Sequence, residues 1–188
     1  MIIRKINKII CMALVVSALS ILGIGIHASQ AADVTLAWDA STSSAVAGYK
    51  LYYGLAPRVY NAPIDVGNVT QYKLTGVAEG KNLYFAVTAY DAKKNESVLS
   101  TELPCWTIIP SVSGSGSITP AVTTVVSSVT PLTFTFTPIL GNSVTDVLVD
   151  NSSVGARDSY IFATPNANHT IKAVFGAFPS ITGLRIIL

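Results

Sequence analysis

The sequence predicts an all-β protein that folds as two β-rich units behind an N-terminal export segment. Val, Ile, Thr, Tyr and Phe dominate residues 32–188 in short runs that alternate apolar and polar positions, the period of a half-buried strand. Clusters of Gly, Pro, Asn, Asp and Ser separate these runs, as turns do in sandwiches and barrels. No long stretch repeats apolar residues at helical spacing.

Residues 1–31 have the layout of a secretory signal peptide. Arg4, Lys5 and Lys8 form a basic start, an apolar run follows from Ile9 to Ile26, and small residues surround Ala31. We expect cleavage after Ala31, with Ala32 as the neighbouring alternative. An uncleaved membrane anchor is the other interpretation, because the run approaches the ~20 residues that span a bilayer. Cleavage predicts a secreted or cell-surface protein, with the periplasm as a further destination.

Removal of this segment changes the charge of the protein. Three of the twelve Lys and Arg lie in it, which leaves nine basic residues against ten acidic ones. A basic patch for nucleic acid is therefore not expected, and a membrane is contacted only through the signal segment if that stays uncleaved. Cys105 becomes the one remaining cysteine, so no internal disulfide forms. We expect it to be a small buried residue, with an intermolecular disulfide as the alternative.

The first unit, residues 32–103, contains alternating runs that each place one row of apolar side chains on a single face. Core-facing positions in these rows include Trp38, Leu51 and Val87. The expected strands are Val34–Trp38, Gly48–Gly54, Thr70–Leu74, Leu83–Tyr90 and Ser97–Leu103.

Several segments of this unit together carry a resemblance to a known family. They are Leu36-Ala37-Trp38-Asp39, Gly48 to Tyr53, the turn Val77 to Gly80, Phe85 to Asp91, and Asn95-Glu96-Ser97 followed by Ser100. With these residues the unit resembles a fibronectin type III domain, which implies an immunoglobulin-like sandwich. The match begins almost at the cleavage site, so the first strand is short or missing and a sheet edge is left exposed.

Residues 104–113 are expected to form a linker, because the composition shifts here to a flexible Ser and Gly-rich stretch. The second unit, residues 114–175, carries Gly116 to Pro120, Thr133-Phe134-Thr135, Val147 to Asp150 and His169 to Phe175. These motifs resemble a bacterial surface repeat related to the internalin-type B repeats, in a single copy. Residues 176–188 form an apolar tail, interpreted as a final strand or a partner contact.

The polar residues predict neither an enzyme nor a cofactor or metal site. His169 is the one histidine after residue 31, and its place at the start of a strand favours a structural hydrogen bond over catalysis. One histidine and one distant cysteine cannot supply the four ligands that zinc commonly needs. A calcium site at Asp146, Asp150 and Asp158 is the alternative for the scattered acids.

Aromatic residues are the strongest candidates for a binding surface. Tyr52, Tyr84 and Tyr90 alternate away from the core-facing rows, with Tyr53, Tyr60 and Tyr72 nearby, and Trp106 lies beside the linker. Exposed aromatic patches commonly mark ligand or partner surfaces. The alternative is that these tyrosines fill half-buried sheet faces, for which their side chains are suited.

The function expected from these features is non-catalytic. The resemblance implies a binding, adhesion or spacer module that contacts an extracellular or envelope protein or a polysaccharide. Two alternatives are a carbohydrate-binding accessory protein of a polysaccharide-degrading system and a structural component of an envelope assembly.

Overall fold

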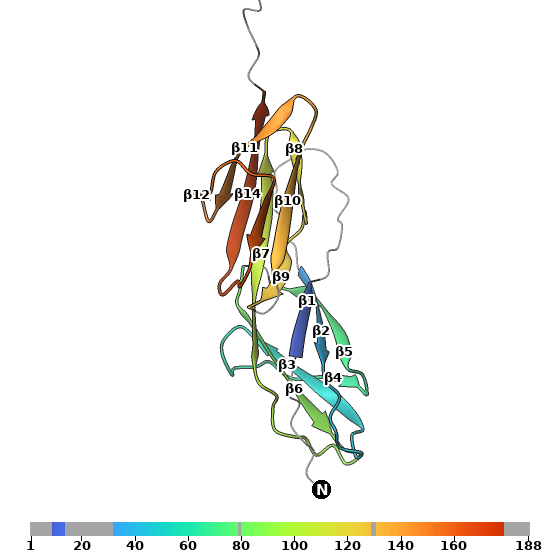
Figure 1. Ribbon diagram of the computed structural model, residues 1–188. Coiled ribbons are helices and arrows are strands. Elements are labelled where there is room, and N and C mark those ends of the chain that lie inside the picture. The colour runs from blue at the N-terminus through green and yellow to red at the C-terminus, as the bar shows by residue number, and fades with distance from the viewer. Residues whose placement is uncertain (1–8, 14–31, 79, 129–130, 179–188) are drawn as a thin grey trace, which may run out of the picture.

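The protein is built from strands alone, arranged as two β-sandwiches placed end to end (Figure 1). The computed structural model describes residues 9–13, 32–78, 80–128 and 131–178. The all-β prediction is confirmed. The strands are β1 (Ile9–Ala13), β2 (Ala32–Trp38), β3 (Gly48–Gly54), β4 (Ile64–Gly67), β5 (Gln71–Val77), β6 (Leu83–Tyr90), β7 (Leu103–Ser113), β8 (Gly116–Thr119), β9 (Thr124–Ser127), β10 (Leu132–Pro138), β11 (Asn142–Val149), β12 (Ser152–Ser153), β13 (Ser159–Phe162) and β14 (His169–Ala177).

The N-terminal sandwich packs a β1-β2-β5 sheet against the strands β4, β3, β6 and the first part of β7. Alternate residues of β2, β3 and β6 meet in one hydrophobic cluster, as the alternation predicts. Trp38, Leu51 and Val87 all belong to it and are buried. Cys105 is also buried in this cluster, as expected for a small apolar residue.

The C-terminal sandwich packs a β13-β10-β8 sheet against β12, β11, β14 and the second part of β7. Its core is a second cluster centred on aromatic residues, among them Phe134, Phe136 and Phe175. The alternating run Leu132 to Thr137 lies in β10, and its two phenylalanines are the buried members of that strand. Each sandwich therefore has its own core.

Residues 104–113, expected to form a linker, lie in the long strand β7 instead. The strand pairs with β6 in the N-terminal sandwich and with β14 in the C-terminal one, where the pairing is parallel. Ser and Gly favour a flexible segment by composition alone, but the edge of β14 provides partners for the backbone here. One sheet consequently runs through both sandwiches in the order β12-β11-β14-β7-β6-β3-β4 (Figure 1).

The last expected strand of the first unit, Ser97 to Leu103, forms a regular strand only from Leu103 onward. Before it, two serines pair the chain with β6. Ser97 and Ser100 donate backbone N–H groups to the carbonyls of Ala89 and Val87. Their hydroxyls accept the N–H groups of the same two residues, at 3.1 Å each. The two serine hydroxyls thus take the place of backbone carbonyls as hydrogen-bond acceptors for β6, and the pairing of this segment with β6 is irregular.

Strand β1 falls inside the segment expected to be a signal peptide. It pairs antiparallel with β2, from Ile9 opposite Trp38 to Ala13 opposite Val34. At the other end, Gly176 and Ala177 complete β14, while residues 179–188 of the apolar tail lie outside the described residues. In the part of the chain that the structure describes, no helix is long and apolar enough to cross a membrane.

Candidate functional site

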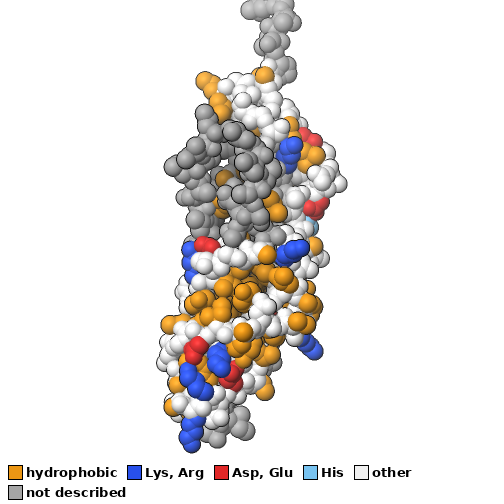
Figure 2. Space-filling view, turned by 180° about the vertical axis from the view of Figure 1, so that it is seen from behind, with side chains coloured by type: hydrophobic (Ala, Val, Ile, Leu, Met, Phe, Trp, Pro, Cys, Tyr) orange, Lys and Arg blue, Asp and Glu red, His pale blue; other side chains and the backbone are white. Residues whose placement is uncertain are grey.

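The candidate site lies on the outer face of the sheet formed by β3 and β6, on the side away from the core. Register places Lys50 opposite Thr88 and Tyr52 opposite Ala86 on this face. Figure 2 shows hydrophobic side chains gathered on the lower half of the molecule, which is the N-terminal sandwich. Two glutamates from the irregular segment before β7 complete the site. We call Lys50, Tyr52, Tyr60, Glu96 and Glu102 the tyrosine–glutamate face.

Glu96 is placed over this face by a tight turn after β6. The Asp91 carboxylate accepts the backbone N–H groups of Lys93 and Asn95 at 2.8 and 2.9 Å, and Lys94 adopts a positive φ of 64°. Asp commonly closes turns in this way through its own side chain. The chain then returns alongside β6, where Glu96 forms an isolated bridge with Tyr90.

The Glu96 carboxylate collects three donors. Lys50 Nζ lies 2.5 Å from Oε1, while the hydroxyls of Tyr52 and Thr88 donate to Oε2 at 2.6 and 2.7 Å. Burial raises the pKa of Glu96, but these hydrogen bonds outweigh burial and hold the pKa below its ordinary value. The carboxylate is therefore ionised and fixed in position.

Glu102 is held by the loop between β3 and β4. Its Oε2 accepts the Tyr60 hydroxyl at 2.5 Å and the Arg58 backbone N–H at 2.7 Å. The loop can turn this tightly because Gly54 has no Cβ: one there would lie 1.8 Å from the Val59 carbonyl oxygen. Arg58 has a positive φ of 60° at the tip.

The two tyrosines join the glutamates into one surface. The rings of Tyr52 and Tyr60 pack edge to face with centroids 5.9 Å apart. Burial, with the hydrogen bond to Glu96, raises the pKa of Tyr52 to about 12. Burial and the carboxylate of Glu102 likewise raise the pKa of Tyr60. Both hydroxyls therefore remain protonated donors over the whole physiological range.

A pocket of about 430 Å³ opens beside Tyr60 and Glu102. Arg58 and the segment from Leu99 to Thr101 form the rest of its lining. Its volume lies in the ordinary range of small-ligand sites, roughly 300–1,000 Å³. The pocket thus combines an aromatic ring, a carboxylate and a guanidinium-bearing residue at one position.

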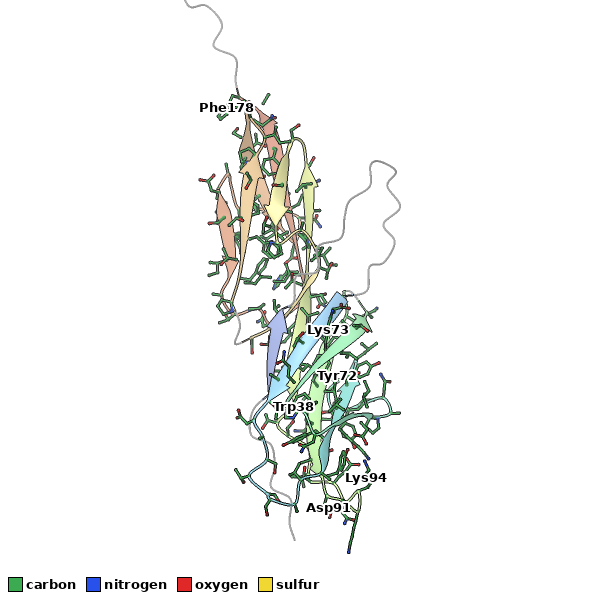
Figure 3. The ribbon with its side chains drawn as sticks, turned by 90° about the vertical axis from the view of Figure 1, so that its right-hand side faces the viewer. Trp38, Tyr72, Lys73, Asp91, Lys94 and Phe178 are labelled. Carbon is green, nitrogen blue, oxygen red and sulfur yellow. The ribbon has the colours of Figure 1, made fainter. Side chains whose placement is uncertain are left out.

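Some of the tyrosines predicted from the sequence belong to this site, and others are buried by neighbouring residues. Tyr52 is part of the tyrosine–glutamate face, and Tyr84 is half-buried on the same sheet face, opposite Gly54. Tyr90 is only 5% exposed, so its predicted place in an exposed platform is wrong. Its hydroxyl donates to Asp65 at 2.7 Å, and Lys94 Nζ lies 3.8 Å from its ring centroid (Figure 3 labels Lys94).

The remaining aromatic candidates pack against the two cores. Trp106 is half-buried against the C-terminal cluster. Tyr53 stacks on Phe85, and Tyr72 packs against the N-terminal cluster. Sequence reasoning missed Glu96, Glu102 and Arg58 as partners of the tyrosines. Glu96 lies 46 residues from Lys50 in the sequence, and Glu102 lies 44 residues from Arg58 and 42 from Tyr60. Alternation within one strand carries no signal for contacts between residues so far apart.

His169 has structural partners. Its Nδ1 lies 2.7 Å from Asp150 Oδ2, and its ring packs against Phe162 at 5.0 Å. Asp150 also accepts the Thr170 N–H at 2.8 Å, so it joins the start of β14 to the turn after β11. Of the acids considered for calcium, Asp146 accepts the Ser153 hydroxyl. Within the described ranges, no three His, Cys, Asp or Glu side chains gather as a metal site would require.

Comparison with known proteins gives partial similarities. No family model matches the chain. A segment of 60 residues is 41% identical to the kelch domain-containing protein SSO1033 of Saccharolobus solfataricus. That segment is 32% of this chain and 8% of the length of that protein.

Among solved structures, the chain is similar to an Fn3-like protein from Clostridium thermocellum, at 24% identity and a TM-score of 0.31, over 38% of this chain and 73% of that one. It is also similar to the central fibronectin-III array of RIM-binding protein, at 12% identity and a TM-score of 0.32, over 95% and 63% of the two chains. Pectate lyase PelI from Erwinia chrysanthemi shares 16% identity over 59% of this chain and 35% of that one, with a TM-score of 0.34. The strand order described above is what carries the sandwich assignment.

Proposed function

We propose that this protein is an exported, non-catalytic binding module that contacts its ligand with the tyrosine–glutamate face. Export is supported by the basic, apolar and small-residue layout of residues 1–31. Binding is supported by one observation above all: two tyrosines and two glutamates from three separate segments are fixed on one face by hydrogen bonds, and Tyr60 and Glu102 line a pocket of about 430 Å³ there.

A polysaccharide is the ligand class that fits this face best. Tyrosine rings supply flat, amphipathic surfaces against which the C–H face of a sugar can pack. Carboxylates accept hydrogen bonds from hydroxyl groups, and such charge-assisted bonds are stronger than neutral ones. In the structure described, Glu102 Oε1 has no hydrogen-bond donor, so it is available to a sugar hydroxyl at the pocket mouth.

Glu96 does not have the property that the acid of glycoside hydrolysis needs. That reaction requires one carboxylic acid with a raised pKa that donates a proton to the leaving group. The pKa of Glu96 is instead lowered by Lys50, Tyr52 and Thr88. Glu96 is thus suited to orient groups, not to protonate them.

A protein partner is the second candidate. Large apolar side chains are exposed near the pocket: Leu55 and Val59 on the β3–β4 loop, and Val98 and Leu99 on the irregular segment. An exposed apolar rim around fixed polar groups is common at protein interfaces.

Affinity measurements on a glycan array test the proposal, with the exported protein and two variants. Tyr60→Ala removes the ring, and Glu102→Gln removes the charge while it keeps the shape. We expect each to weaken polysaccharide binding at least tenfold, about 1.4 kcal/mol. Asp33→Asn is the matched control, because Asp33 is a half-buried, ion-paired carboxylate on the opposite sheet.

The outcomes separate the two ligand classes. Array binding that both variants lose supports a polysaccharide ligand. A silent array, with a captured envelope protein that the same variants release, supports the protein partner. Binding of either kind that survives both variants at full strength would place the contact elsewhere and contradict the proposal. Thermal unfolding of each variant checks that its fold is intact.

A further inference from the structure

The edge of β2 is covered by a strand that the proposed signal cleavage removes. Strand β1 pairs with β2 over five positions, from Ile9 opposite Trp38 to Ala13 opposite Val34. It also contacts β9 and β7, which belong to the other sheet. β1 thus lies over the opening between the two sheets of the N-terminal sandwich. Cleavage after Ala31 takes residues 9–13 away and leaves β2 at the start of the processed chain.

The processed chain therefore carries a strand-accepting edge. The opposite edge of β2 is already paired with β5. On the freed edge, the backbone N–H and C=O groups of β2 that point away from β5 lose their partners, next to the side chains of Val34, Leu36 and Trp38. These three side chains are at most 5% exposed and form part of the core. Unpaired edges of this kind readily add an extended segment of another chain.

Residues 185–188 match the strand that is lost. Lys8-Ile9-Ile10-Cys11 is a basic residue, two isoleucines and an apolar residue, and Arg185-Ile186-Ile187-Leu188 repeats that order. Added in the register of β1, in which Ile9, Ile10 and Cys11 lie opposite Trp38, Ala37 and Leu36, Ile186 would take the place of Ile9, Ile187 that of Ile10 and Leu188 that of Cys11. Directly opposed residues share a face, so Ile186 and Leu188 would point into the core and Ile187 outward.

A molecule cannot place its own residues 185–188 on its own β2. Figure 3 shows Phe178 at the far end of the C-terminal sandwich, with Trp38 in the N-terminal one. The nine residues of β14 alone span about 30 Å. Asn168, just before β14, is hydrogen-bonded to Gly80 at the junction, and Trp38 lies beyond that point. Eight residues from Phe178 to Ile186 reach at most about 29 Å.

We propose that the processed protein assembles head to tail, with residues 185–188 of one copy added as a strand to β2 of the next. Such a contact joins two different surfaces, so it forms rings or open filaments and not closed dimers. The proposal rests on the proposed signal cleavage. It does not depend on the tyrosine–glutamate face or on the ligand bound there.

The first measurement is mass spectrometry of the N-terminus of the exported protein. We expect it to begin at Ala32. A protein that retains Met1 keeps β1 on β2, and this result overturns the proposal.

Light scattering of the processed protein over a range of concentrations is the second measurement. We expect oligomers that dissociate on dilution. Ile186→Lys places a charge on the core-facing side of the added strand, so the dissociation constant should rise at least tenfold. Ile187→Lys is the matched control. The same change one residue away faces outward, so it should shift the dissociation constant less than threefold. Equal effects of the two variants, or monomers at every concentration, contradict the proposal.

Deletion of residues 179–188 completes the test. The shortened protein should be monomeric, and a synthetic peptide of residues 179–188 should bind it with one site per molecule. Oligomers that persist after the deletion reveal a different contact and overturn the proposal. Array binding by the Ile186→Lys variant should be unchanged, which keeps this result separate from that of the ligand-binding proposal.

Discussion

Asp65 shows how single residues fix the outer face of the N-terminal sandwich. Its carboxylate accepts the Tyr90 hydroxyl at 2.7 Å, the Gly67 N–H at 3.1 Å and an ion pair from Lys94 at 2.9 Å. Tyr90 in turn requires glycine at position 48, because a Cβ there would lie 2.3 Å from its hydroxyl oxygen. Together these contacts tie β3, β4 and the turn after β6.

Acid should weaken these contacts in a defined pH range. Hydrogen bonds from Lys94, Tyr90 and Gly67 lower the pKa of Asp65 from 3.8 to about 2. A lowered pKa stabilises the fold above pH 3.8, and this contribution is lost as the pH falls toward 2. We expect the difference in Tm between wild type and Asp65→Asn to be largest above pH 4 and to shrink by pH 2. The exposed Asp39→Asn variant is the control, and a difference that stays constant with pH contradicts the assignment.

Among the strands, those that could be predicted are the ones whose own side chains determine their position. The bounds of β3 and β6 agree with the alternation because alternate residues of each strand pack in the N-terminal core and each strand is limited by glycine or a turn. The short strand β9 could not be predicted in this way. All four of its residues are buried, with Val125 in one core and Val126 in the other. Alternation is absent where a strand lies between two cores.

Tertiary contacts explain the remaining differences between prediction and structure. β7 depends on the edge of β14, some sixty residues away, and the glutamates of the site depend on loops that bring them to the tyrosines. Of the aromatic residues named from the sequence, only Tyr52 and Tyr60 belong to the site, because the exposure of a side chain depends on what covers its strand face. Tyr90 alternates as predicted and is nevertheless buried, since Lys94 and Asp65 cover it.

At the irregular junction of β6 and β7, the Ser100 hydroxyl replaces a strand carbonyl. Ser100→Ala would leave the buried Val87 N–H without its 3.1 Å acceptor. An unsatisfied buried donor costs about 1–3 kcal/mol, so we expect a loss of that size in the free energy of unfolding. Urea denaturation measures it. Ser117→Ala, at an exposed position of β8, should change stability by less than about 0.5 kcal/mol. Similar losses in both variants would argue against the role of Ser100.

Over the whole molecule, the two sandwiches are coupled by a shared strand and one asparagine. The Asn168 carbonyl oxygen accepts the Thr107 N–H at 2.8 Å and its hydroxyl at 3.2 Å. Its amide donates to the Gly80 carbonyl and to Asn82 Oδ1, both at 3.0 Å. One side chain from the C-terminal sandwich thus holds both β7 and a turn of the N-terminal sandwich. Since β7 also enters both cores, we expect the two halves to unfold together.

The two tryptophans allow this coupling to be measured, because Trp38 packs in one core and Trp106 against the other. With Trp38→Phe or Trp106→Phe, fluorescence reports a single half, and the urea transitions of the two halves should coincide.

Asn168→Ala leaves the buried Thr107 N–H unpaired, which costs about 1–3 kcal/mol. We expect it to separate the two midpoints, whereas Asn168→Asp keeps the acceptor and should separate them less. Exposed Asn166→Ala is the control. Coincident midpoints in Asn168→Ala would mean that β7 alone carries the coupling.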